Sequence, residues 1–196
     1  MPQRRTVEVL LDDVRWALDS ALSPRELVAM LERLLREAPA GSEAALFAQR
    51  HLARLLLREQ PFRAARLLRE ALEELPHDDE LWGLLGIALT MLGQYKSAAH
   101  AHRRGLSLVP GSVTHLHNLG HLLDVGLGRP DQGLRYLAAA HRALADEEEI
   151  ASSYAHALAG AGQSAKARTV LMKVLDWSAE RADEQLSRWL AARSAD

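Results

Sequence analysis

The sequence predicts an all-α fold in which short turns join about eleven helices and no segment has a convincing strand pattern. Hydrophobic residues make up 48% of the 196 residues but aromatic residues only 5%, so the core must be built mainly from Leu and Ala. These side chains suit close packing between helices and do not suit a β-sandwich. An arrangement of large and small residues also recurs, with 34 residues between Gly86 and Gly120, which indicates repeated helix pairs.

The clearest copy of this arrangement covers residues 79–112. Large residues stand where they can fill the space between two antiparallel helices, and small residues stand where the helices must approach closely. Gly93 falls at the turn, where glycine adopts a positive φ without steric cost, and Pro110 ends the second helix. The pattern consists of Trp82, Leu85, Gly86, Leu89, Gly93, Tyr95, Ala98, His102, Gly105 and Pro110.

This order of residues resembles the tetratricopeptide repeat, a helix–turn–helix unit of about 34 residues. The resemblance implies a right-handed α–α superhelix, or solenoid, over residues 42–178. It also implies a scaffold that binds other proteins and not a reaction. The expected repeats are 45–78, 79–112, 113–147 and 148–178.

The other three copies are less complete than the first. The interval from Gly93 to Gly128 is 35 residues, so we expect Val125–Gly128 to absorb one extra residue in the turn. The copy at 113–147 is carried by Leu116, Leu119, Gly120, Leu123, Gly133, Leu137 and Ala140. The copy at 148–178 is carried by Tyr154, Ala155, Leu158, Gly162, Ala167 and Leu171, and the copy at 45–78 by Leu52, Leu55, Ala64, Ala71 and Pro76.

Two segments flank the repeats. Residues 1–41 are predicted to form a helical pair that could be a degenerate repeat. Ser23, Pro24 and Glu26 predict the start of its second helix, because Ser followed three residues later by Glu is the signature of a capping box. Residues 179–196 are predicted to form an amphipathic capping helix, since the last repeat of a solenoid would otherwise expose its apolar face.

Composition excludes several classes of protein. The chain has no cysteine, which rules out disulfides, thiolate catalysis and cysteine-based metal centres, and which fits a reducing compartment. A net charge of −2 does not favour nucleic acid or an anionic membrane. No apolar run follows the basic Met1–Arg5 segment, and the uncharged stretch Leu81–Tyr95 is too short to span a bilayer. We expect a soluble cytoplasmic protein without a signal peptide or a cofactor.

The resemblance also implies where a partner binds. In this family the first helix of each repeat lines a concave groove that holds a peptide or a partner helix. We predict apolar contacts from Leu84, Ile87 and Met91, and one fixed cation, Arg50. We predict polar contacts from His117, Asn118, His121, Ser153 and His156.

The histidines could also belong to a metal site or a catalytic site. His117 and His121 have a spacing that could place two imidazoles over one metal ion, and Asp124 and His156 could approach them. The segment lacks the glutamate of the metalloprotease motif, so we assign no metal ligand. Ser153 beside His156 lacks a predicted orienting acid and oxyanion hole, so we expect no catalytic residue. His102 stands where the family has a large core residue, so we expect it to pack. Several groove histidines would gain charge together near pH 6.

The predicted function is therefore a non-catalytic scaffold or adaptor that holds a peptide or helix of a partner protein. A secretion-type chaperone that guards an apolar segment of a client is the closest alternative. A metal-binding protein that uses the histidines is a less favoured one. The sequence leaves open whether the chain is a monomer or a homodimer.

Overall fold

A computed structural model of the protein describes residues 2–20 and 22–193. Within these ranges the regular structure consists of eleven α-helices and one π-helix, with no strand, which confirms the predicted all-α class. The remainder of the predicted end segments, Met1 and Ala21 in 1–41 and residues 194–196 in 179–196, lies outside the described residues. The chain divides into two compact units, residues 1–94 and 95–196, and the boundary falls inside the predicted repeat 79–112.

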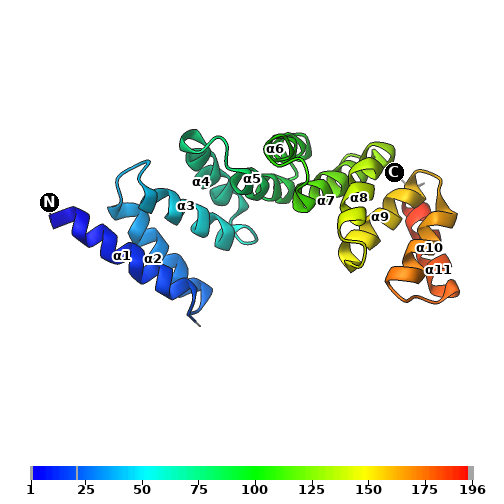
Figure 1. Ribbon diagram of the computed structural model, residues 1–196, viewed down its shortest axis with the longest axis horizontal. Coiled ribbons are helices and arrows are strands. Elements are labelled where there is room, and N and C mark those ends of the chain that lie inside the picture. The colour runs from blue at the N-terminus through cyan, green and yellow to red at the C-terminus, as the bar shows by residue number, and fades with distance from the viewer. Residues whose placement is uncertain (1, 21, 194–196) are drawn as a thin grey trace. The chain divides into compact units, whose positions relative to one another are not determined.

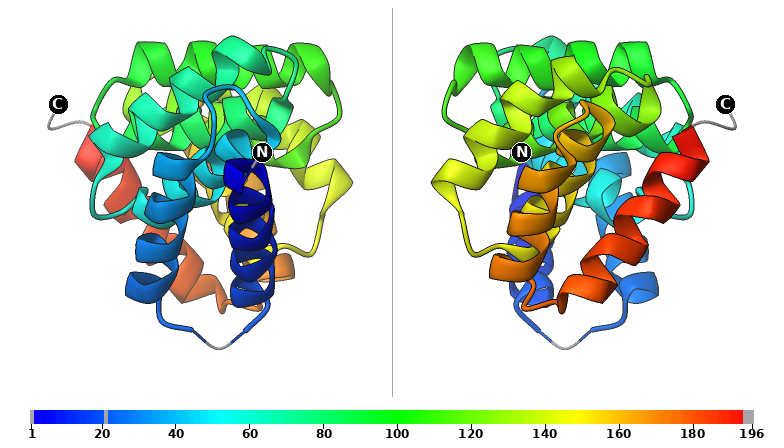
Figure 2. Two further views of the ribbon diagram at one scale, coloured as in Figure 1. Left: turned by 90° about the vertical axis from the view of Figure 1, so that its left-hand side faces the viewer. Right: turned by 90° about the vertical axis from the view of Figure 1, so that its right-hand side faces the viewer.

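Unit 1 consists of five helices, each packed against the next one along the chain. The helices are α1 (Pro2–Leu18), α2 (Pro24–Glu37), α3 (Glu43–Leu56), α4 (Pro61–Glu74) and α5 (Asp79–Met91). The first two lie side by side, as both views of the blue segment show (Figures 1 and 2). Leu and Ala fill the interior between α3 and α4, with Leu52, Ala64 and Leu68 fully buried.

The predicted start of α2 is confirmed. The backbone N–H of Ser23 donates to Glu26 Oε2 at 2.9 Å, and the backbone N–H of Glu26 donates to Ser23 Oγ at 3.4 Å. Pro24 occupies the first helical position. The reciprocal pair satisfies N–H groups that the first turn of a helix cannot satisfy internally.

Unit 2 contains six α-helices and one π-helix. They are α6 (Tyr95–Leu108), α7 (Val113–His121), η1 (Leu122–Gly126), α8 (Pro130–Ala143), α9 (Glu148–Gly160), α10 (Ser164–Val174) and α11 (Ala179–Arg193). The turns before α6, α8 and α10 contain Gly93, Gly128 and Gly162 at φ +69°, +61° and +74°. The predicted turn glycines are therefore confirmed, since positive φ is disfavoured for other L-residues.

Glycines allow α7 and α8 to cross with their backbones close together. A Cβ on Gly133 would lie 2.5 Å from the carbonyl oxygen of Gly120, and a Cβ on Gly120 would lie 2.6 Å from Leu137 Cγ. Gly120 thus faces the neighbouring helix, as predicted. The extra residue of this repeat lies in the π-helix, where the N–H of Leu127 bonds to the carbonyl of Leu122 at 3.0 Å. The π-helix starts three residues before the predicted Val125–Gly128 turn.

Unit 2 also contains a buried pair of histidines. His102 on α6 and His115 on α7 are almost fully buried, and their Nδ1 atoms lie 3.3 Å apart. Gly105 provides the room, because a Cβ there would lie 2.2 Å from the His115 ring. His102 therefore packs in the core, as predicted, and burial lowers its pKa to about 4.

The C-terminal helix α11 packs on α9 and α10. Ala182 and Leu186 enter a core that contains Leu158 and Leu171, and Trp177 and Trp189 pack against its edge. Within the described residues, no helix has both the length and the apolar character needed to cross a membrane.

Candidate functional site

All nine predicted contact residues lie on odd-numbered helices, the first helices of the predicted repeats. Arg50 lies on α3, Leu84, Ile87 and Met91 on α5, His117, Asn118 and His121 on α7, and Ser153 and His156 on α9. Five of them therefore belong to unit 2 and four to unit 1.

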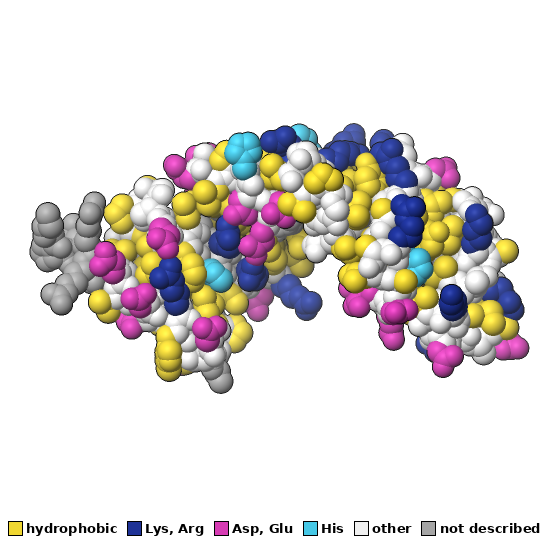
Figure 3. Space-filling model, in the orientation of Figure 1, with side chains coloured by type: hydrophobic (Ala, Val, Ile, Leu, Met, Phe, Trp, Pro, Cys, Tyr) yellow, Lys and Arg dark blue, Asp and Glu magenta, His cyan; other side chains and the backbone are white. Residues whose placement is uncertain are grey.

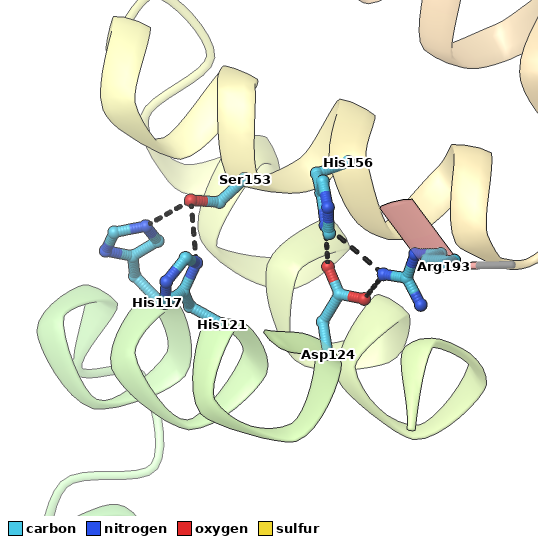
Figure 4. A network of polar contacts seen from close by, with 6 residues as sticks. All are labelled: His117, His121, Asp124, Ser153, His156 and Arg193. Carbon is cyan, nitrogen blue, oxygen red and sulfur yellow. Dashed lines mark hydrogen bonds and ion pairs between the residues drawn. The ribbon is translucent and has the colours of Figure 1, made fainter. Parts of the chain in front are cut away.

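In unit 2, Ser153 joins two predicted histidines across the α7–α9 contact. Its hydroxyl lies 3.0 Å from Nε2 of His117 and 3.4 Å from Nδ1 of His121 (Figure 4). Ser153 is buried, His117 is half-buried and His121 is exposed. A hydroxyl can donate to one ring nitrogen and accept from another, so both contacts can exist together.

A second cluster, next to the first, is centred on Asp124 (Figure 4). This carboxylate is only 1% exposed. Its Oδ2 atom lies 2.5 Å from Nδ1 of His156, and its Oδ1 atom accepts a hydrogen bond from the Arg193 guanidinium. Ion pairing with Arg193 compensates for the cost of burying the carboxylate.

The spacing of His117, His121 and Asp124 predicts one shared helical face, but the structure assigns them to two clusters. Asp124 lies in the π-helix, where five residues instead of four separate hydrogen-bonded groups. Its carboxylate bonds to His156 and Arg193, and His117 and His121 contact Ser153. The carboxylate therefore does not orient either imidazole that contacts Ser153, as the acid of a catalytic triad would.

Arg193, Gly160 and Trp189 were not predicted as site residues. Arg193 belongs to α11 and reaches Asp124 across 69 positions of sequence. The Arg193 guanidinium packs against Gly160, where a Cβ would lie 2.5 Å from the guanidinium carbon. The Trp189 ring meets the His156 ring at 5.0 Å between centroids and 80° between planes. The amphipathic pattern of α11 was the only sequence signal for these contacts.

In unit 1, Arg50 is already engaged by carboxylates. Its guanidinium bonds to Asp78 and lies 3.2 Å from Glu80 Oε2. Asp78 also accepts from the backbone N–H of Leu81 at 2.9 Å and so caps α5. Arg50 thereby ties α3 to the start of α5.

The three predicted apolar residues differ in exposure. Leu84 is buried, with 8% of its surface exposed, and Ile87 is partly buried. Met91 is 47% exposed. Of the three, Met91 offers a partner the most surface.

Burial shapes the electrostatics of the unit 2 site. Desolvation lowers the pKa of His117, and the opposing effect of Glu149 is smaller. The imidazole of His121 is crowded by neighbouring helices although the residue is exposed, and this desolvation lowers its pKa against the pull of Asp124. Both rings stay neutral to lower pH than a free histidine. Among the described residues, no three His, Asp or Glu side chains converge as metal ligands.

Basic side chains gather elsewhere in unit 2. On the face drawn in Figure 3, Lys and Arg side chains cluster over α6 and α8. Exposed residues there include Lys96, Arg103, Arg135 and Arg142. These even-numbered helices carry none of the predicted contact residues.

Comparison with known proteins agrees with this architecture. Residues 55–119 match the family model described as tetratricopeptide repeat. Solved structures of MamA share the fold. The structure of MamA residues 41 to the end from Desulfovibrio magneticus RS-1 is 17% identical, covers 90% of this chain and 96% of that chain, and has a TM-score of 0.76. Another crystal structure of MamA is 16% identical, covers 95% of this chain and 94% of that chain, and has a TM-score of 0.71.

A MamA structure from MSR-1 is 19% identical, covers 94% of this chain and 98% of that chain, and has a TM-score of 0.67. At these identities the likeness shows the fold alone. No curated protein matches the chain in sequence. The family match over residues 55–119 confirms the tetratricopeptide-repeat resemblance there, and the rest of the chain shares the all-α solenoid fold of the MamA structures.

Proposed function

We propose that this chain is a cytoplasmic, non-catalytic scaffold that binds a peptide or helix of a partner protein through α3, α5, α7 and α9, the first helices of the predicted repeats. The fold is typical of interaction scaffolds. The absence of cysteine supports a reducing compartment. A net charge of −2 supports a protein partner over nucleic acid.

The observation that carries the proposal is the polar surface on α7. Asn118 is partly exposed, and its side-chain amide makes no hydrogen bond within the described residues. An amide of this kind can donate to a peptide carbonyl and accept from a peptide N–H. His117 and His121 flank it, and both are held by Ser153. Side chains that are already positioned lose less conformational entropy when a partner binds.

Met91 supports an apolar contribution from unit 1. Its flexible thioether side chain adapts to irregular partner surfaces, and Ile87 lies one helical turn before it. We propose that these two residues contact an apolar side of the partner. Arg50, which Asp78 and Glu80 hold in place, would act mainly by fixing α5.

The test is an affinity pull-down from native cell extract, read by mass spectrometry. The variant Met91→Glu/His121→Glu adds two charges at exposed positions of odd-numbered helices. A matched control, Phe62→Glu/Leu144→Glu, adds the same charge at positions on or at the end of even-numbered helices that are 71% and 49% exposed. We expect a protein retained by the wild type and the control but not by the first variant. Identical protein lists for all three chains would contradict the proposed site.

A further inference from the structure

The cluster around Asp124 has the shape and charge of a slot for one guanidinium group. Asp124 supplies a buried carboxylate at one side, and His156 lies 2.5 Å from its second oxygen. Gly160 leaves the space that the guanidinium occupies: a Cβ there would lie 2.5 Å from Arg193 Cζ and 2.7 and 2.8 Å from its two terminal nitrogens. The slot therefore combines a fixed anion with a gap that any larger residue at position 160 would reduce.

The present occupant comes from the last helix of the described chain. Only two of the fifteen residues of α11, Ala182 and Leu186, are buried, so this helix has a small share in the core. Arg193 bonds to Asp124, but its own Nε atom is buried without a hydrogen-bond partner in the described residues. An unsatisfied buried donor costs free energy. Arg193 thus fills the slot without satisfying all of its own donors.

The slot also lies beside the surface proposed to bind a partner. Asp124 follows α7 directly, and His156 and Gly160 lie on α9, which carries Ser153 (Figure 4). A peptide in contact with Asn118 and His121 would therefore run close to the slot. Any basic side chain of that peptide would compete with Arg193 for the same carboxylate.

We propose that the slot formed by Asp124, His156 and Gly160 recognises an arginine side chain of the partner, and that Arg193 closes it in the free chain. This inference rests on the proposed function and specifies the partner's chemistry. Arginine fits better than lysine because its planar guanidinium fills the gap over Gly160 and is more weakly hydrated than an ammonium group, so it is buried at lower cost. Binding would exchange Arg193 for the partner's arginine and release the end of α11.

The test uses the full chain and a small probe, N-acetyl-arginine-N-methylamide, with the lysine counterpart as the comparison. The ring signals of His156 are followed by NMR in wild type, Arg193→Ala and Arg188→Ala. Arg188 is the control, because it lies on the same helix and its guanidinium pairs at 2.6 Å with the exposed Glu184. We expect a saturable shift with the arginine probe in Arg193→Ala only, and affinity about tenfold weaker for the lysine probe.

Two further variants keep the test decisive. Gly160→Ala in the Arg193→Ala background should abolish the shift, because the added methyl fills the slot. If Arg193→Ala does not fold, Arg193→Lys replaces it in the test. The arginine probe should then displace the lysine ammonium group and shift the ring signals of His156. No shift in either folded Arg193 variant, or equal shifts in wild type, would overturn the inference. A pull-down that depends on Met91 and His121 while the probe fails to bind would leave the proposed function standing without the arginine slot.

Discussion

Neutralising Asp124 should destabilise unit 2 measurably. Asp124→Asn keeps the size of the side chain but leaves the Arg193 guanidinium without its counter-charge. Removing one partner of a buried pair costs about 3–5 kcal/mol, whereas an exposed pair contributes at most about 1 kcal/mol. Asp124 is 1% exposed and Arg193 25%, so the pair lies between these limits. We expect a loss of about 2–3 kcal/mol in the free energy of unfolding.

The assay is urea denaturation followed by circular dichroism at pH 7, applied to a double-mutant cycle. Arg193→Met is the second single variant, because it retains the apolar stem and leaves Asp124 without its guanidinium partner. If the two groups interact, the double variant should lose about 1–3 kcal/mol less than the sum of the single variants. Asp183→Asn is the control and should stay close to wild type, since Asp183 pairs with Arg168 at the exposed surface. Strict additivity, or a loss below about 0.5 kcal/mol for Asp124→Asn, would refute the reasoning.

Four further substitutions, one of them a control, test the packing and the electrostatics by the same denaturation assay. Gly133→Ala should cost about 1–3 kcal/mol, because its methyl would collide with the Gly120 carbonyl. Gly111→Ala has open space around it and should stay near wild type. Gly162→Ala should cost about 1 kcal/mol through its positive φ alone. The pKa of His102 is lowered from 6.5 to about 4 in the folded chain. At pH values between these two, the unfolded chain therefore binds more protons than the folded chain. Stability should therefore fall by up to about 3 kcal/mol from pH 7 to pH 4, and His102→Gln should reduce that slope. A pH dependence as steep as that of the wild type in this variant would contradict the assignment.

Local signals in the sequence predicted the fold well because each has a direct stereochemical cause. Ser23 and Glu26 cap α2 since they supply the groups that a first turn lacks. Gly93 and Gly162 mark turns because only glycine adopts positive φ without strain. These effects depend on a few neighbouring residues, so they can be read without knowing the tertiary structure.

The candidate site was predicted only in part, because its geometry depends on distant contacts. One extra residue before Gly128 can be absorbed in a turn or in a π-helix, and the spacing alone does not distinguish them. In the π-helix, the Asp124 side chain contacts His156 and Arg193 and does not contact the Ser153 cluster. Arg193 lies 69 positions away, and no local pattern connects the two residues.

Exposure was the second property that periodicity could not supply. Leu84 and Met91 share a predicted helical face, yet one is buried and the other is half exposed. The difference depends on which neighbouring helices cover each position. Arg50 was predicted as a fixed cation, and the carboxylates that engage it come from the turn before α5 and from its first residues.

Hydrogen–deuterium exchange of the full chain, alone and with the captured partner, tests the central claim most directly. If α5, α7 and α9 bind the partner, amide protection should increase in these helices and stay unchanged in α6 and α8. The end of α11 should exchange faster when the partner displaces Arg193. Protection confined to α6 and α8, with α7 and α9 unchanged, would contradict the account.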